Sequence, residues 1–258
     1  MNMRLDGRRS IVTAGAGGAG LAIARTLADA GATVFVGDVD PEAIAGLPQP
    51  LIGAVVDVAD SDAVSRWITP IASEGVDILV NNAGIAGPTK AIEDITPEEW
   101  RRCLAVGLDS QYLCAREVVS TMKTAGVGSI VNIASTAGYM GMPYRAPYVA
   151  AKFGVVGLTK TLAMELGRDG IRVNAIAPGS IIGDRLDRVV AALGDADGLS
   201  VEQVETMYKQ GVSLARFIDP QEIADMVLYL CSDHARSISG QVIGVDGNTE
   251  TLYPRPFS

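Results

Sequence analysis

The sequence predicts a single α/β domain spanning residues 1–258, built on a doubly wound parallel sheet of about seven strands with helices on both faces. Short β-branched runs alternate with helical patterns from end to end, and no linker, repeat or low-complexity segment interrupts them. Several runs are apolar at nearly every position, as expected of parallel strands that helices cover on both sides. A chain of 258 residues, 48% of them hydrophobic, is long enough to bury a substantial core.

Seven runs are expected to form the strands, in chain order. They are RSIVTAG (9–15), ATVFVGD (32–38), LIGAVVDV (51–58), DILVNNAG (77–84), GSIVNIAS (128–135), IRVNAIAPG (171–179) and GQVIGVDG (240–247). Helical patterns fall between them and are expected at 18–31, 61–72, 96–123, 146–167 and 219–233. The one long departure is 181–216, rich in Asp and Gly, which we expect to cross the carboxyl edge of the sheet as a substrate-covering lid.

Charge and composition exclude several functions. A net charge of −9 argues against nucleic acid as a partner, because binding phosphates requires a basic face. No apolar run is long enough to span a membrane, and the N-terminus does not resemble a signal peptide, so a cytoplasmic protein is expected. Three widely spaced cysteines are expected to be buried reduced thiols, and with a single histidine, His234, no metal site is predicted.

The turn after the first strand predicts a dinucleotide site. Gly15, Gly17 and Gly20 form a G-x-G-x-x-G pattern that lets the backbone approach a pyrophosphate at a helix N-terminus. Asp38 ends the second strand 18 residues after Gly20, where a carboxylate accepts hydrogen bonds from the adenosine ribose and repels a 2′-phosphate. No Arg or Lys between Gly15 and Gly20 or directly after Asp38 offsets that repulsion, so the sequence favours NAD over NADP.

Five motifs, in order, resemble the short-chain dehydrogenases/reductases, and the resemblance covers nearly the whole chain. The motifs are TAGAGGAG (13–20), NNAG (81–84), Ser135 in NIASTAG, YVAAK (148–152) and PGSI (178–181). The resemblance implies a single-domain Rossmann fold and an oxidoreductase that moves a hydride between a nicotinamide cofactor and a carbonyl or alcohol carbon.

The resemblance assigns the catalytic roles to Ser135, Tyr148 and Lys152. Tyr148 would exchange a proton with the substrate oxygen, and Ser135 would hold the same oxygen. Tyr148 and Lys152 are four residues apart and share one face of a helix, so the ammonium can lie near the phenol. A nearby cation favours the phenolate and moves the pKa of Tyr148 from its usual value near 10 toward the working range.

The resemblance also implies a set of cofactor-binding residues along the carboxyl edge. They are Gly15, Gly17, Gly18, Gly20, Asp38, Asp57, Val58, Asn82, Ala83, Gly84, Tyr148, Lys152, Pro178, Gly179 and Ile181.

Three positions depart from the family pattern. Ala14 replaces a glycine, so a negative φ is expected there, with Gly15 supplying some of the lost freedom. Gly183 replaces a threonine that often contacts the cofactor. Gly107 stands where the family carries an asparagine that holds a water linking the lysine to solvent. Either backbone carbonyls or another side chain hold that water, with Asp109 and Ser110 as nearby polar candidates, or catalysis is lost and the protein only binds NAD(H).

The substrate is expected to be a secondary alcohol. Arg185 and Arg188 of the lid, with Tyr144 and Arg145 before Tyr148, are substrate candidates, because clustered arginines bind carboxylates. A sugar acid or hydroxy acid, a neutral polyol and a hydrophobic alcohol all stay open, as does surface pairing of these arginines. An NADPH-dependent ketoreductase of the 3-oxoacyl type is the alternative activity. From the resemblance we also expect this chain to form a homotetramer, with its Pro-containing C-terminal tail on a neighbouring subunit or near its active site.

Overall fold

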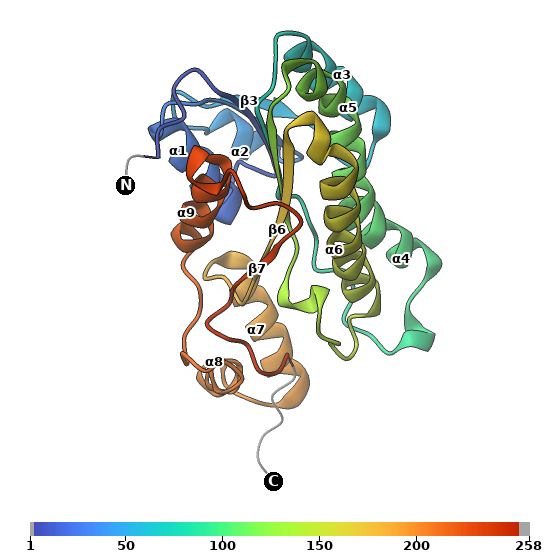
Figure 1. Cartoon of the computed structure of the whole chain (residues 1–258). Coiled ribbons are helices and arrows are strands. Elements are labelled where there is room, and N and C mark those ends of the chain that lie inside the picture. Colours follow the sequence, from blue (N-terminus) through green and yellow to red (C-terminus); the bar gives the residue numbers. More distant parts are fainter. Residues whose placement is uncertain (1–2, 253–258) are drawn as a thin grey trace.

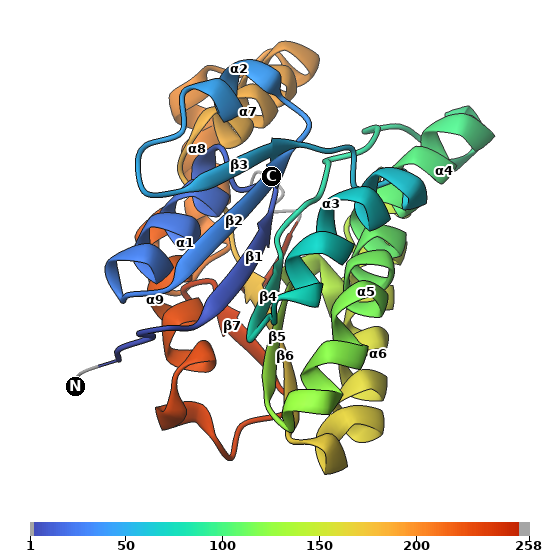
Figure 2. The ribbon, with the colours of Figure 1, turned by 90° about the horizontal axis from the view of Figure 1, so that it is seen from above.

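The computed structural model describes residues 3–252, apart from the side chains of Arg185, Ala192, Asp195, Ala196 and Asp197. Within that part of the chain, seven parallel strands form one sheet in the order β3-β2-β1-β4-β5-β6-β7 (Figures 1 and 2). The strands are β1 (Arg9–Thr13), β2 (Thr33–Asp38), β3 (Ile52–Val55), β4 (Ile78–Asn81), β5 (Gly128–Ile133), β6 (Ile171–Pro178) and β7 (Val242–Val245). The predicted doubly wound sheet is therefore confirmed.

Helices cover both faces of the sheet, as Figure 2 shows from above. One face carries α1 (Gly18–Asp29), α2 (Pro41–Ala45) and α9 (Pro220–Cys231). The other face carries α3 (Ser61–Ser73), α5 (Ser110–Ala125) and α6 (Ala146–Leu166), with α4 (Pro97–Leu104) leading into α5. Each face buries its own apolar cluster against the same strands, so the middle strands are apolar on both sides.

Register places β1 between β2 and β4, with Val12 opposite Val36 of β2 and Val80 of β4. The chain leaves β1 toward β2 and later returns to pair β4 on the other side, so the strand order reverses there. In doubly wound sheets the crevice at such a reversal is where ligands bind. The fold therefore puts the glycine-rich turn after β1 and the Asn-rich turn after β4 beside one crevice.

Three elements differ from the sequence expectations. The helix expected over 96–123 is interrupted by a π-helical turn, Ala105–Asp109, which separates α4 from α5. The lid segment, for which no helix was expected, folds into α7 (Asp184–Asp197) and α8 (Val201–Gln210) beside the carboxyl edge of β7 (Figure 1). The short α2 was not expected, and it begins at Pro41 after an Asp40 N-cap.

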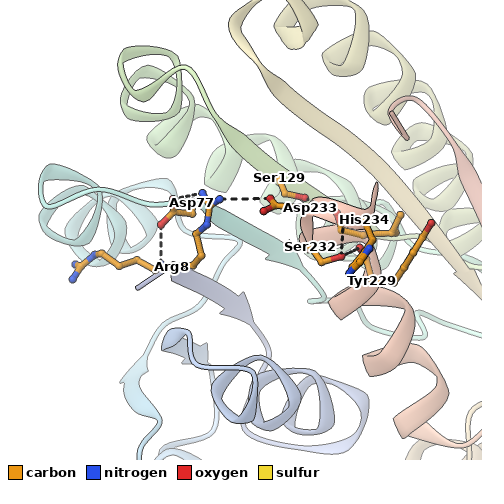
Figure 3. Close-up of polar contacts among 9 residues, drawn as sticks. Arg8, Asp77, Ser129, Tyr229, Ser232, Asp233 and His234 are labelled. Atoms are coloured by element: carbon orange, nitrogen blue, oxygen red, sulfur yellow. Dashed lines mark hydrogen bonds and ion pairs between the residues drawn. The ribbon is translucent and has the colours of Figure 1, made fainter. Parts of the chain in front are cut away.

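A polar cluster ties together the amino ends of the strands, opposite the crevice (Figure 3). Arg8 pairs with Asp77 at 3.0 Å and with Asp233 at 3.7 Å. The Ser232 hydroxyl donates to the carbonyl of Tyr229 and accepts from the backbone N–H of His234. The lone histidine therefore lies at the far edge of the molecule from the crevice. Within residues 3–252, no helix is long and apolar enough to cross a membrane.

Candidate active site

A cleft of about 540 Å³ opens at the carboxyl edge of the sheet. Turns after β1, β4, β5 and β6 form one side of it, and α7, α8 and the C-terminal segment form the other. Residues that the sequence predicts for the site and that line this cleft are Gly17, Gly18, Gly20, Asn82, Gly84, Ser135, Arg145, Tyr148, Lys152, Pro178, Gly179, Ile181 and Arg188. The sheet edge therefore brings most of the predicted site into one place.

Glycine is required in the first turn for two different structural reasons. A Cβ on Gly20 would lie 2.0 Å from the carbonyl oxygen of Ala14, and one on Gly15 would lie 2.9 Å from Val36. These two glycines therefore allow close helix–strand packing. A Cβ on Gly17 or Gly18 would meet no protein atom within 4 Å, so these two face the open cleft. Their exposed backbone at the start of α1 fits a pyrophosphate.

Ala14 contradicts the expectation of a negative φ, because its φ is +50°. The left-handed conformation is held by its neighbours: the Asn82 side-chain amide donates to the carbonyls of Thr13 and Ala14 at 3.1 and 2.9 Å. The Thr13 hydroxyl accepts in turn from the backbone N–H groups of Asn82 and Ala83 at 2.9 and 3.0 Å. The turns after β1 and β4 are thus locked together, and Ala14 itself, not Gly15, takes the conformation of the missing glycine.

The Asp38 carboxylate lies against the glycine-rich turn. It accepts from the backbone N–H of Ala16 at 3.1 Å and from that of Asp40 at 3.2 Å. Both contacts fix the carboxylate at the end of β2. A carboxylate in this place can accept hydrogen bonds from ribose hydroxyls, as the sequence predicts.

Asp57 and Val58 follow β3 on the outer side of the same edge. Val58 is buried, whereas the Asp57 carboxylate is partly exposed and pairs with Arg102 of α4 at 3.0 Å. Burial opposes ionisation of Asp57, but the Ala59 N–H and the Arg102 guanidinium hold its pKa below the usual value. The structure thus gives Asp57 an ion pair with α4 that the sequence did not indicate.

Tyr148 and Lys152 lie on the first turns of α6, beside Ser135 at the end of β5. The Lys152 ammonium is 5.9 Å from the centre of the Tyr148 ring and donates to the carbonyl of Ile133 at 2.8 Å. Lys152 is only 4% exposed, and its Nζ lies against Gly84. Ser135 lines the cleft, and its hydroxyl accepts from the backbone N–H of Ala137 at 3.2 Å. The phenol therefore has a buried cation close by.

Arg145 places a second cation against the same ring. Its guanidinium carbon lies 5.1 Å from the centre of the Tyr148 ring, and its Nη2 donates to the carbonyl of Ala86 at 2.8 Å. Arg145 is 6% exposed although it lines the cleft. Burial raises the pKa of the neighbouring Tyr208 phenol, and the charge of Arg145 opposes that shift. An arginine this deeply held can meet an anionic group without a large loss of rotamer entropy.

The other predicted substrate residues separate in space. Arg188 of α7 lines the cleft, whereas Tyr144, which has a φ of +62°, lines a neighbouring hollow with Lys90 and Phe153. The side chain of Arg185 and the Pro-containing tail lie outside the described part of the structure. Cleft-lining residues that the sequence reasoning missed include Tyr208, Thr249 and Thr251. The last two come from the C-terminal segment, whose backbone pairs with Gly211 at the end of α8.

Gly107 sits in the π-helical turn and is buried. The turn confirms the expectation that glycine there keeps the bend in the helix. The two polar candidates near it do not face the site: Asp109 is exposed, and the Ser110 hydroxyl donates to the carbonyl of Val106 in its own helix. A residue one turn further along, Gln111, is buried and donates to Ile133, the same carbonyl that Lys152 uses.

The cleft fits a dinucleotide by its own geometry. The open faces of Gly17 and Gly18 lie at one end of the cleft, and Asp38 lies beside that end. The Lys152 ammonium and the Ser135 hydroxyl lie at the other end. Among the described residues, no group of three or more His, Cys, Asp or Glu side chains is arranged to hold a metal ion.

Comparison with known proteins agrees with this geometry. A family model described as enoyl-(acyl carrier protein) reductase matches residues 14–248. D-beta-hydroxybutyrate dehydrogenase of Rhizobium meliloti (strain 1021) is 36% identical over 253 residues, covering 93% of this chain and 97% of that protein. The 3-oxoacyl-[acyl-carrier-protein] reductase FabG of Thermotoga maritima is 34% identical over 254 residues, covering 95% of this chain and 98% of that protein.

Solved structures are similar over the whole domain. The NAD+-bound structure of a xylitol dehydrogenase gives a TM-score of 0.89 at 28% identity, covering 94% of this chain and 99% of that one. A Beutenbergia cavernae protein with bound NADP gives 0.86 at 32% identity, covering 96% of this chain and 98% of that one. With its ordered motifs, its sheet-edge cleft and these relatives, the chain belongs to the short-chain dehydrogenase/reductase family and is an oxidoreductase.

Proposed function

We propose that the protein is an NAD-dependent dehydrogenase that oxidises a secondary alcohol carrying a carboxylate, either a hydroxy acid or a sugar acid. The observation that carries this proposal is the surroundings of Tyr148. Two cations, Lys152 and Arg145, lie within 6 Å of its ring in a cleft that continues to the glycine-rich turn. The first supports acid–base chemistry at the phenol, and the second also offers a charge for the substrate.

The proposed chemistry assigns one step to each side chain. The Tyr148 phenolate accepts the proton of the substrate hydroxyl while the carbinol carbon gives up its hydride. The cofactor supplies the acceptor for that hydride. Ser135 donates a hydrogen bond to the substrate oxygen and holds the carbon in place. Lys152 stabilises the phenolate by its positive charge, and general base catalysis of this kind contributes about 10²–10⁴-fold in rate.

Asp38 supports NAD as the cofactor. Its carboxylate is fixed against the glycine-rich turn, where a 2′-phosphate would meet a negative charge. We expect kcat/KM for NAD+ to exceed that for NADP+ by at least about tenfold, since one unfavourable charge contact of about 1.4 kcal/mol suffices for that ratio. The measurement is initial-rate kinetics with both cofactors on one substrate. A preference for NADP+ would contradict this assignment.

Arg145 and Arg188 support a carboxylate on the substrate. We expect turnover with hydroxy acids and sugar acids to exceed turnover with polyols and aliphatic alcohols of the same size. Replacing Arg188 with Gln should raise KM for an acid substrate about 10-fold, the effect of losing one charge-assisted hydrogen bond, and leave a polyol's KM unchanged. Arg236→Gln, an exposed change at the far edge of the molecule, is the control. Equal rates with acids and polyols would contradict the substrate class.

The second candidate activity is reduction of a 3-oxoacyl thioester with NADPH. It is favoured by the similarity to the FabG reductase of Thermotoga maritima. NADPH oxidation in the presence of a 3-oxoacyl thioester, at a rate above that of alcohol oxidation with NAD+, would favour it. The remaining alternative, a protein that binds NAD(H) without turnover, rests on Gly107 and Ala14, two of the departures from the family pattern.

We also propose a cytoplasmic homotetramer. The outer faces of α5 and α6 expose the apolar side chains of Tyr112, Phe153 and Met164, which are 51%, 47% and 84% exposed in the single chain. Burying such side chains between copies of the chain is favourable. Light scattering with size-exclusion chromatography should give the mass of four chains, and a monomer would contradict the proposal.

A further inference from the structure

A column of buried polar side chains lies behind the catalytic lysine. Asn81 of β4, Gln111 of α5, Asn132 of β5 and Thr159 of α6 are each at most 1% exposed. Asn81 donates to Asn132 Oδ1 at 2.9 Å, and Asn132 donates to Thr159 Oγ1 at 2.9 Å. These contacts fix the orientation of the Asn132 amide and join two strands to α6. The column is therefore an ordered polar layer inside an otherwise apolar core.

Gln111 connects this column to Lys152. Its Nε2 donates to the carbonyl oxygen of Ile133 at 3.4 Å, and the Lys152 ammonium donates to the same oxygen at 2.8 Å. A carbonyl oxygen has two lone pairs, so it can serve both donors. The amide of Asn81 also donates to the backbone carbonyl of Gln111 at 3.3 Å. The Gln111 amide and the buried Lys152 ammonium are thus linked through the carbonyl oxygen of Ile133.

Two acceptors in the column have no hydrogen-bond partner among the described residues: Gln111 Oε1 and Asn81 Oδ1. Both belong to side chains that are 1% exposed. Native proteins satisfy nearly all buried acceptors, and they use ordered water where no protein donor is in reach. The Gln111 oxygen belongs to the amide that donates to Ile133, so it favours a buried water molecule beside that amide.

The π-helical turn explains why the amide comes from Gln111. A Cβ on Gly107 would lie 3.1 Å from the Cβ of Ala151, the residue before Lys152, so the turn packs closely on α6 at that point. The position that carries an asparagine in the family has no side chain here. One helical turn later, Gln111 projects from the same helix toward the Ile133 carbonyl.

We infer that Gln111 is a positioning residue for Lys152, and that its amide holds the Ile133 carbonyl and a buried water that together solvate the lysine charge. It would take the part that the family gives to the asparagine replaced by Gly107. The inference rests on the proposed function, since Lys152 matters to turnover only if Tyr148 is the acid–base group.

The first test is the pH dependence of kcat/KM for alcohol oxidation by Gln111→Leu. Leucine has a similar size but removes the amide, so the Lys152 ammonium loses polar neighbours and the Tyr148 phenolate loses stabilisation. The acid limb should therefore move to higher pH by about one unit, with a loss of about 10-fold in rate near neutrality. Affinity for NADH, measured by fluorescence, should stay within about twofold because the amide lies behind the cleft wall.

Two variants serve as controls. Gln241→Leu makes the same chemical change at an exposed position before β7 and should leave the acid limb unmoved. Gln111→Asn keeps an amide at the same position and should move the acid limb less than Gln111→Leu does. An unmoved limb in Gln111→Leu, or a limb that Gln241→Leu moves equally, would overturn the inference.

A crystal structure of the unmodified protein is the second test, and it does not depend on how the variants fold. It should show an ordered water within hydrogen-bond distance of Gln111 Oε1. A protein group in that place would overturn the inference. Failure of the proposed function is distinguishable, because the unmodified enzyme would then show no alcohol oxidation at all.

Discussion

Ala14 holds a backbone conformation that an L-amino acid adopts at a cost. Its φ of +50° is fixed by the Asn82 amide and by the close approach of Gly20 to its carbonyl. The left-handed region costs a residue with a Cβ about 1–2 kcal/mol. The site geometry is therefore kept in spite of the substitution, and part of the folding free energy is used to keep it.

Ala14→Gly should raise the free energy of unfolding by about 1 kcal/mol, because it relieves this strain by more than the entropy that glycine adds to the unfolded chain. The measurement is urea unfolding of both proteins. Ala22→Gly, in the middle of α1, is the matched control and should lower stability by about 0.5–1 kcal/mol. A loss of stability in both variants would contradict the account of Ala14.

Residues of the candidate site could be predicted where the interacting side chains are close together in the sequence. Tyr148 and Lys152 are four residues apart, so the helix alone brings them together, and the structure has both on α6. Gln111 was missed because its position depends on the π-helical turn before it, which shifts the faces of the helix. The sequence does show a polar residue four positions after Gly107. Its relation to Lys152 becomes visible only in the structure, through the hydrogen bond from Gln111 to the Ile133 carbonyl.

In the turn between β1 and α1, the different roles of two glycines, Gly17 and Gly20, can be tested by replacing each with alanine. Gly17→Ala should fold as stably as the unmodified protein, because a Cβ there meets no protein atom within 4 Å. It should weaken NADH binding at least about tenfold, since the methyl group occupies the pyrophosphate approach. Gly20→Ala should lower the melting temperature, because its Cβ would lie 2.0 Å from a backbone oxygen.

Thermal melting and NADH fluorescence titration separate the two effects. Gly17→Ala should change affinity without stability, and Gly20→Ala should change stability first. If Gly17→Ala bound NADH as tightly as the unmodified protein, the cofactor would not approach this turn.

At the level of elements, the strands were predictable because apolar β-branched runs between helical patterns have few other structures to adopt. The lid was predicted only as a covering segment. Its folding into α7 and α8 depends on the Ser200–Gln203 capping box and on contacts with the rest of the domain. The short helix α2 depends on its Asp40 N-cap, which follows the second strand so closely that no separate helix was expected there.

For the whole molecule, the alternation of strands and helices predicts a doubly wound parallel sheet, in which ligands bind at the carboxyl edge, so the edge that carries the cleft was predictable. The strand order β3-β2-β1-β4-β5-β6-β7 was not predicted, because alternation and right-handed crossovers allow more than one order. The share of the cleft formed by Thr249 and Thr251 was not predicted either, because the path of the C-terminal segment is set by long-range pairing with the end of α8. The C-terminal segment and the lid together form one wall of the cleft. The shape of the cleft therefore depends on segments that are far apart in the sequence.

The role of Tyr148 is tested most simply by NADH formation from NAD+ and a hydroxy acid or sugar acid, compared between the unmodified protein and Tyr148→Phe. We expect turnover by the unmodified protein and a loss of at least about 10³-fold in kcat for Tyr148→Phe, with NADH affinity nearly unchanged. Equal turnover by the two proteins would contradict the assignment of Tyr148 as the acid–base group.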